Sequence, residues 1–316
     1  MRKTMNLPDE LHFIVNGFKP QKNTKARLDG KKCIITGATS GVGLAAARRI
    51  AQGGADLVLV CRNKEKASSV KDELSAEYGC NVGLVFADFA DFDQVRHASA
   101  EILEKNSKID ILVNNVGIYN TGRVLNKDGV EMVFFVNHLS PFLLTKLLLD
   151  RIIESAPARI LYVNSQGHRF GGLDLDDLNW EKRRYWGLQG YGAAKTAQLL
   201  TIWELSEQLK GKGVTVNAMH PGGVKTNIGM NNGLLYRLYQ RYLLAPFLSK
   251  PKISGEAIYY LIAAPEMSDI SGKFYNQTIE EKPAAHALNR ELGKRVWEIS
   301  EKMTTLDSEM QVRNYE

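Results

Sequence analysis

Residues 32–43 read Lys-Cys-Ile-Ile-Thr-Gly-Ala-Thr-Ser-Gly-Val-Gly, an apolar run that passes directly into a glycine-rich turn. The run 32–36 predicts a strand, and the alanines after Gly43 predict a helix. Glycines let the backbone turn tightly and approach a pyrophosphate, and a helix N-terminus offers free N–H groups to its negative charge. Because the turn stands between a strand and a helix, the stretch predicts a dinucleotide-phosphate site. Its expected members are Gly37, Thr39, Ser40, Gly41, Val42 and Gly43.

Short apolar runs alternate with helical patterns from Lys31 to about Lys302. Further strands are expected at 55–61, 81–86, 109–113, 158–164, 214–219 and 272–276, with helices at 64–78, 91–105, 130–154 and 191–210. This alternation predicts an α/β fold, a single Rossmann-like doubly wound domain with a mainly parallel sheet of about seven strands and helices on both faces. The domain is expected to span residues 31–316, after a polar, basic extension at residues 1–30.

Composition limits the class of protein. The chain has 316 residues, 44% hydrophobic and 24% charged, as in an ordinary globular protein. Its six scattered histidines and three unpaired cysteines predict no metal site. Without a clear signal peptide or an uninterrupted apolar run of about 18 residues, a cytoplasmic protein is expected.

The net charge of +6 is unevenly distributed, since no acidic residue occurs between Gln208 and Gly255. This basic stretch could meet anionic lipid or a phosphate-bearing cofactor, or it could simply face solvent. No DNA- or RNA-binding motif accompanies the charge, so a nucleic-acid partner is not expected.

The end of the second expected strand bears on which dinucleotide would bind. An NAD-preferring site carries an acidic residue there, which hydrogen-bonds the ribose 2′-hydroxyl. Here Cys61 is followed by Arg62, whose guanidinium could pair with a 2′-phosphate. The pair favours NADP(H) over NAD(H), although an exposed loop arginine needs no ligand.

Tyr191 and Lys195 stand four residues apart on an expected helix and therefore share one face. A tyrosine with an unperturbed pKa of about 10 is a poor base at neutral pH, and a nearby cation favours its phenolate. Such a pair could exchange a proton with a substrate oxygen. Ser165 ends the fifth expected strand, where its hydroxyl could stabilise that oxygen or merely form a turn.

These motifs, in this order, resemble the short-chain dehydrogenase/reductase family. The segment Asp174-Leu-Asp-Asp-Leu-Asn-Trp180 and the Cys61-Arg62 pair resemble its retinol-dehydrogenase-like branch. The resemblance implies that Ser165, Tyr191 and Lys195 are catalytic, and that the backbone of Asn137 holds a water linking Lys195 to solvent. From the sequence alone, Asn137 could equally form a helix–helix hydrogen bond. The implied cofactor contacts, beyond the turn and Arg62, are Asp88, Phe89, Asn115, Val116, Gly117, Tyr191, Lys195, Pro221, Gly222, Val224 and Thr226.

The branch commonly acts on lipophilic carbonyls or alcohols such as retinoids and steroids, and the family commonly forms homo-oligomers. An apolar insertion at about 226–252 suits such a substrate as a lid. It could also rest on a membrane surface or pack at a subunit interface. The sequence therefore predicts an NADP(H)-dependent oxidoreductase. The alternatives are a non-catalytic NADP(H)-binding protein that senses redox state or acts as a scaffold, and a membrane-surface lipid-binding protein.

Overall fold

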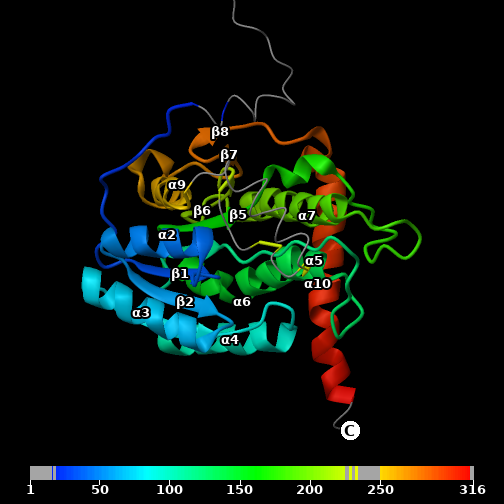
Figure 1. The fold of residues 1–316 in the computed structure, drawn as a ribbon, viewed down its shortest axis with the longest axis horizontal. Helices are drawn as coiled ribbons and strands as arrows, with labels where there is room; N and C mark the ends of the chain where they lie inside the picture. Colours follow the sequence, from blue (N-terminus) through cyan, green and yellow to red (C-terminus); the bar gives the residue numbers. More distant parts are fainter. Residues whose placement is uncertain (1–15, 17–18, 225–227, 230–231, 234–249, 314–316) are drawn as a thin grey trace, which may run out of the picture.

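The computed structural model describes residue 16 and residues 19–224, 228–229, 232–233 and 250–313. Its centre is one eight-stranded sheet in the order β3-β2-β1-β4-β5-β6-β7-β8 (Figure 1). All neighbouring strands pair in parallel except β7 and β8, which are antiparallel. The strands are β1 (Lys32–Thr36), β2 (Asp56–Cys61), β3 (Val82–Phe86), β4 (Ile111–Asn114), β5 (Ala158–Val163), β6 (Val214–His220), β7 (Phe274–Asn276) and β8 (Ile279–Glu280).

Helices cover both faces of this sheet. The core on one face is closed by α2 (Gly41–Gln52), α3 (Lys64–Tyr78) and α9 (Lys252–Ala263). The core on the other face is closed by α4 (Phe92–Lys105), α6 (Ser140–Glu154) and α7 (Gly187–Gln208), and α10 (Arg290–Arg313) packs on α7 from outside. Shorter helical elements are α5 (Met132–Phe134), the π-helical turn Phe135–Leu139, and 3-10 helices at Gln166–Phe170, Pro265–Met267 and Ala285–Leu288.

The predicted doubly wound fold is confirmed. The sheet has eight strands rather than about seven because β8 contains only two residues, too few to show a period-two pattern. The expected helix at 191–210 begins at Gly187. Gly187 and Gly190 weaken the helical signal, yet a Cβ atom at Gly187 would lie 2.5 Å from the carbonyl oxygen of Asn120. Close packing therefore requires glycine at the start of this helix.

The expected helix at 130–154 is continuous in space but changes its winding. It runs through α5, the π-helical turn and α6. Among the described residues, Met132–Glu154 is the one helical stretch long and apolar enough to cross a membrane, and 78% of its most apolar window is buried inside the protein. That burial is typical of a core helix in a doubly wound fold.

Part of the 1–30 segment lies against the domain. The backbone N–H of Leu28 donates to Gly53 O at 2.8 Å, and Tyr259 of α9 donates to Ala26 O at 2.6 Å. The guanidinium of Arg49 lies 3.5 Å from the centre of the Tyr259 ring. Residues 26–28 are thus fastened to the α2 and α9 side of the sheet.

Candidate active site

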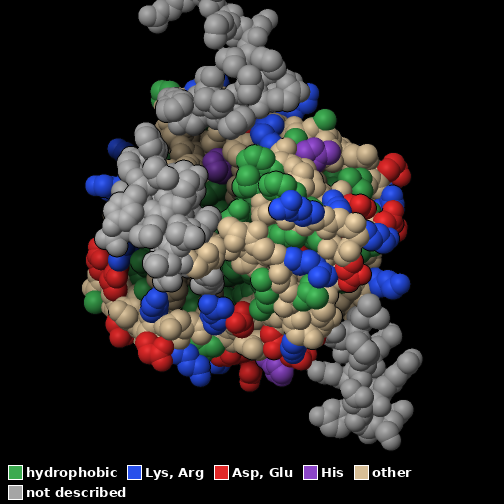
Figure 2. All heavy atoms as spheres, turned by 45° about the vertical axis from the view of Figure 1, so that its right-hand side comes forward, with side chains coloured by type: hydrophobic (Ala, Val, Ile, Leu, Met, Phe, Trp, Pro, Cys, Tyr) green, Lys and Arg blue, Asp and Glu red, His purple; other side chains and the backbone are tan. Residues whose placement is uncertain are grey.

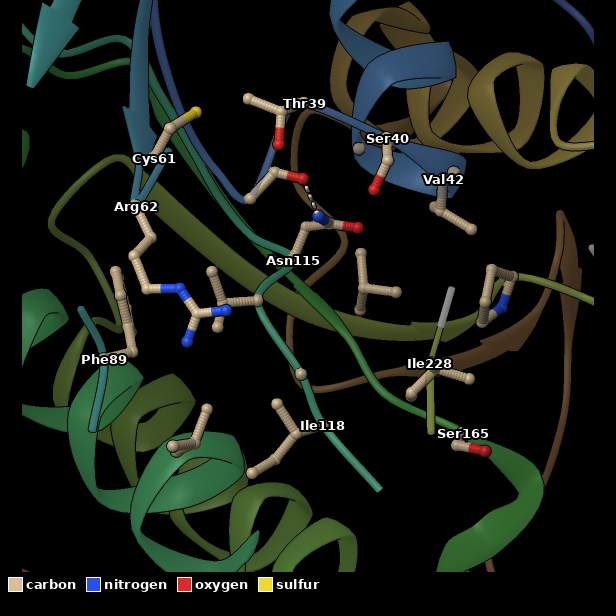
Figure 3. Close-up of a pocket in the computed structure, with 18 of the residues that line it drawn as sticks. Thr39, Ser40, Val42, Cys61, Arg62, Phe89, Asn115, Ile118, Ser165 and Ile228 are labelled. Atoms are coloured by element: carbon tan, nitrogen blue, oxygen red, sulfur yellow. Dashed lines mark hydrogen bonds between the residues drawn. The ribbon is translucent and has the colours of Figure 1, made fainter. Parts of the chain in front are cut away.

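A cleft of about 960 Å³ opens at the carboxyl ends of the parallel strands. It lies at the reversal of strand order. From β1 the sheet continues through β2 and β3 on one side, and through β4 and β5 on the other. Doubly wound sheets bind ligands at this reversal of strand order. The hollow opens on the face shown in Figure 2, and Figure 3 shows its lining, from Arg62 at one end to Ser165 at the other.

The lining contains all but two of the residues predicted to bind the cofactor or act in catalysis. These are the six residues of the glycine turn, together with Arg62, Asp88, Phe89, Asn115, Val116, Gly117, Ser165, Tyr191, Lys195, Pro221, Gly222 and Val224. Asn137 lies just behind the lining. Thr226 and most of the 226–252 insertion lie outside the described residues.

The glycine turn is held by the loop after β4. Asn115 Nδ2 donates to Thr36 O at 2.8 Å and to Gly37 O at 3.2 Å. In return, Thr36 Oγ1 accepts the backbone N–H groups of Asn115 and Val116, at 2.8 and 3.0 Å. A Cβ atom at Gly43 would lie 2.3 Å from Gly37 O, so glycine is required for this close approach. The Asn115 side chain is thereby used to shape the turn.

Two cations border the end of the cleft next to β2. Arg62 extends from the end of β2 and is 71% exposed, with Nη1 3.3 Å from Asp88 Oδ2. Asn63 caps α3 by accepting the N–H of Lys66 at 2.7 Å, which places Lys66 in the first turn of that helix and in the cleft lining. Lys66 was missed by sequence reasoning. The sequence did contain a sign of it, because Asn63 is a typical helix cap just after the second expected strand and places the first-turn residues beside that strand's end.

Ser165 and Tyr191 meet across Gly167. Ser165 Oγ accepts the N–H of Gly167 at 2.9 Å, so its own proton is available for donation to a ligand. A Cβ atom at Gly167 would lie 2.5 Å from Tyr191 Cε1 and 3.3 Å from Ser165 Oγ. The absence of a side chain at Gly167 lets the hydroxyl and the phenol ring occupy the same corner of the cleft.

Lys195 lies one helical turn after Tyr191. Its Nζ donates to Val163 O at 2.9 Å and lies 5.8 Å from the centre of the Tyr191 ring. Burial lowers the pKa of Lys195 to about 7, because removal from water disfavours the ammonium form. The charge of Lys195 therefore changes near neutral pH, and an anion bound in the cleft would favour the charged form.

Asn137 stands in the π-helical turn beneath the loop after β4. Its Oδ1 accepts the N–H of Ile118 at 2.7 Å, and its Nδ2 donates to Ile118 O at 2.9 Å. The carbonyl oxygen of Asn137 accepts a hydrogen bond from Gln198 Nε2 at 2.8 Å. The side chain thus fixes the backbone beside Gly117, and its carbonyl is tied to α7.

The far end of the cleft is formed by the segment after β6. Gly222 has a φ of +89°, and a Cβ atom there would lie 2.3 Å from Gln277 Nε2. Ser254 Oγ donates to Pro221 O at 2.6 Å and anchors the turn to α9. His220 also lines the cleft, and burial lowers its pKa to about 4, so it is neutral at pH 7. Sequence reasoning missed His220.

An apolar wall was also missed. Its residues come from the loop after β4, the α5 region and the start of the insertion: Ile118, Val124, Met132, Val136 and Ile228. Each is an ordinary hydrophobic residue in the sequence, and only the fold brings them to one side of the cleft.

The cleft has the features that a dinucleotide requires. The α2 N-terminus, which no side chain caps, and the glycine turn lie in the middle of the cleft. Arg62 and Lys66 stand at one end, and Ser165, Tyr191 and Lys195 at the other. No group of three or more His, Cys, Asp or Glu side chains suited to a metal occurs in the part of the chain that the structure describes.

Comparison with known proteins identifies one family by both sequence and structure. The short chain dehydrogenase family profile matches residues 31–234. Human retinol dehydrogenase 13 is 36% identical over 301 residues, which cover 94% of this chain and 90% of that protein. A short chain dehydrogenase from Burkholderia cenocepacia J2315, solved in complex with NADP, superposes with a TM-score of 0.64 at 26% identity, over 79% of this chain and 96% of that one. A 3-ketoacyl-(acyl-carrier-protein) reductase from Brucella melitensis, complexed with NADH, gives a TM-score of 0.59 at 28% identity, over 79% and 96%.

Proposed function

Because this chain belongs to the short chain dehydrogenase family, we propose that it is an NADP(H)-dependent oxidoreductase that exchanges hydride with the carbonyl or alcohol of a lipophilic substrate. Membership of the family makes it an oxidoreductase acting on CH–OH or carbonyl groups of small molecules. The choice of NADP(H), the substrate class and the residue roles are the proposal. The observation that carries it is the convergence of Ser165, Tyr191 and Lys195 at one end of a dinucleotide-sized cleft.

The proposed acid–base chemistry follows from the positions of Ser165, Tyr191 and Lys195. A bound nicotinamide supplies or accepts the hydride. In the direction of reduction, Tyr191 gives its phenolic proton to the substrate oxygen, and Ser165 donates a hydrogen bond to the same oxygen as it gains charge. The ammonium of Lys195 favours the phenolate that remains, because opposite charges close together stabilise each other. Asn137 keeps the backbone beside Gly117 in place through its two hydrogen bonds with Ile118.

The preference for NADP(H) rests on Arg62 and Lys66. A ribose 2′-phosphate in the β2 end of the cleft would be attracted by both of these cations. Asp88 is the acidic group nearest to Arg62, and it already accepts the N–H of Ala90 at 3.0 Å as well as the guanidinium. Arg62 therefore adds positive charge at the place where an NAD-preferring site would carry a carboxylate.

The lipophilic substrate class rests on the apolar wall. Met132 and Val136 line the cleft from the α5 region. Ile118 of the loop after β4 and Ile228 at the start of the insertion line it as well (Figure 3). Binding an apolar body against such side chains releases water from both surfaces and favours the complex. The carbonyl of the substrate would be the polar end, directed toward Ser165 and Tyr191.

The test is a spectrophotometric assay of NADPH oxidation with a panel of aldehydes and ketones of increasing chain length. NADH and the variant Tyr191→Phe are run beside it. We expect turnover with NADPH that rises with substrate hydrophobicity and is lost in the variant. Tight NADPH binding with no turnover on any carbonyl, and no reduction of NADP by the matching alcohols, would overturn the catalytic proposal.

A further inference from the structure

Two buried side-chain amides link the three elements that carry the proposed catalytic groups. Asn164 precedes Ser165 at the end of β5, and Gln198 lies one turn after Lys195 on α7. Both residues are only 2% exposed. Neither belongs to the chemistry proposed above, and buried amides of this kind occur where each polar atom has a partner.

Asn164 connects β5 to α7. Its Oδ1 accepts the backbone N–H of Ser165 at 2.7 Å. Its Nδ2 donates to the carbonyl oxygen of Lys195 at 3.0 Å and to Gln198 Oε1 at 2.8 Å. One side chain therefore holds the backbone of both Ser165 and Lys195.

Gln198 extends the connection to the π-helical turn. Its Nε2 donates to the carbonyl oxygen of Asn137 at 2.8 Å, while its Oε1 accepts from Asn164. A π-helical turn departs from the regular i to i+4 pattern, and such turns occur frequently at functional sites. Here the carbonyl oxygen of Asn137 in that turn is held by a side chain from a different helix.

We propose that Gln198 and Asn164 are positioning residues that hold Ser165, Lys195 and Asn137 in fixed register through one continuous chain of hydrogen bonds. This inference rests on the proposed function for its effect on turnover. The chain of bonds itself makes a prediction that does not depend on turnover. Asn164 lines the cleft, but the hydrogen bonds of both side chains go to each other and to the backbones of Ser165, Lys195 and Asn137, through which they act.

The side chain of Gln198 must both donate and accept, and this requirement allows a sharp test. Gln198→Met is close in size but provides neither the donor nor the acceptor. Gln198→Glu keeps the acceptor for Asn164, and it can donate to Asn137 O only while the carboxyl is protonated. Because the site is buried, the introduced carboxyl should titrate well above its usual range and within reach of ordinary buffers.

We expect kcat of Gln198→Met to fall about tenfold at every pH. The kcat of Gln198→Glu should lie within about twofold of wild type at pH 5.5 and fall to the level of Gln198→Met by pH 8. The Kd for NADPH should change less than about twofold in both, because the proposed phosphate contacts, at the glycine turn, Arg62 and Lys66, lie on elements other than α7. The matched control is Thr201→Val, which removes a buried hydroxyl of α7 that, among the described residues, bonds to carbonyls of its own helix, at 3.1 and 3.2 Å.

A second measurement keeps the inference separate from the catalytic proposal. Hydrogen exchange of the NADPH-bound protein, followed by mass spectrometry, reports on the N–H of Ser165 without any turnover. Exchange in the peptide containing Ser165 should be about tenfold faster in Gln198→Met than in Thr201→Val. Equal exchange in the two variants, or a ratio of Gln198→Glu to wild-type kcat that does not change with pH, would overturn the positioning role. Lack of turnover in the wild type would overturn only the proposed function.

Discussion

Gly167→Ala should disable the proposed reaction without disturbing the cofactor end of the cleft. The added methyl would lie 2.5 Å from Tyr191 Cε1, whereas carbon atoms in contact prefer about 3.5–4.0 Å. The Tyr191 ring would therefore have to retreat by about 1 Å. Ser165 Oγ, 3.3 Å from the same methyl, would be crowded as well. Gly167 does not have a positive φ, so the effect is steric and not a backbone effect.

A displacement of about 1 Å at a reacting group can reduce turnover by about 100-fold. Overpacking of this kind typically destabilises a protein by about 1–3 kcal/mol. We therefore expect kcat of Gly167→Ala to fall about 100-fold while its Kd for NADPH stays within about twofold of wild type. The assays are steady-state NADPH oxidation, NADPH fluorescence titration and urea denaturation.

The matched control is Gly122→Ala, because a Cβ atom at Gly122 would have nothing within 4 Å and its φ is not positive. It should behave as wild type in all three assays. Wild-type kcat in Gly167→Ala would show that turnover does not require the Tyr191 ring to stay in its position against Gly167. Equal losses in the two variants would refute the steric argument.

Three further predictions concern cofactor choice, pH and stability. Arg62→Ala and Lys66→Ala should each raise the Kd for NADPH about tenfold in fluorescence titrations and leave that for NADH within about twofold; an equal effect on both nucleotides would contradict the 2′-phosphate assignment. Lys195 has a folded pKa of about 7, below its unfolded value of 10.5, so the unfolded chain binds more protons between these pH values and stability should rise with pH. The free energy of unfolding of the wild type, measured by urea denaturation, should rise by about 2 kcal/mol from pH 7 to 9 relative to that of Lys195→Met. The same pH dependence in both proteins would show that Lys195 is not desolvated. The side chain of Glu281 is 1% exposed and paired with Arg169, so Glu281→Gln should lower the free energy of unfolding by about 3 kcal/mol. The exposed Glu280→Gln should lower it by less than about 1 kcal/mol. Similar losses in the two variants would refute the buried-pair argument.

Much of the fold could be predicted because its signals are local. The expected strand at 32–36 and the expected helix at 64–78 agree with the structure residue for residue. Misses occurred where packing outweighed local propensity. Gly187 is a poor helix former on its own, but it begins α7 because a larger side chain would collide with Asn120.

Which of these residues line one cleft was predictable for the same reason, up to a limit. The glycine turn and the Tyr191–Lys195 spacing are short motifs in which the chemistry follows from residue type and interval. Lys66 had only the local signal of the Asn63 cap. His220 and the apolar wall have no such motif, because they reach the cleft only when strand ends far apart in the sequence are brought side by side. The roles of all the predicted site residues stay predictions, including those of Thr226 and of the 226–252 insertion.

The sequence by itself determined the order of the elements and the kind of chemistry that the residues can perform, because periodicity, glycine spacing and side-chain type act within a few residues. Only the tertiary structure decided how these groups are tuned. The pKa of Lys195 is lowered by burial, which depends on every element packed around it. The connection from Ser165 through Asn164 and Gln198 to Asn137 joins residues 61 positions apart at its longest step. Contacts of that range exist only once the sheet and its helices have assembled.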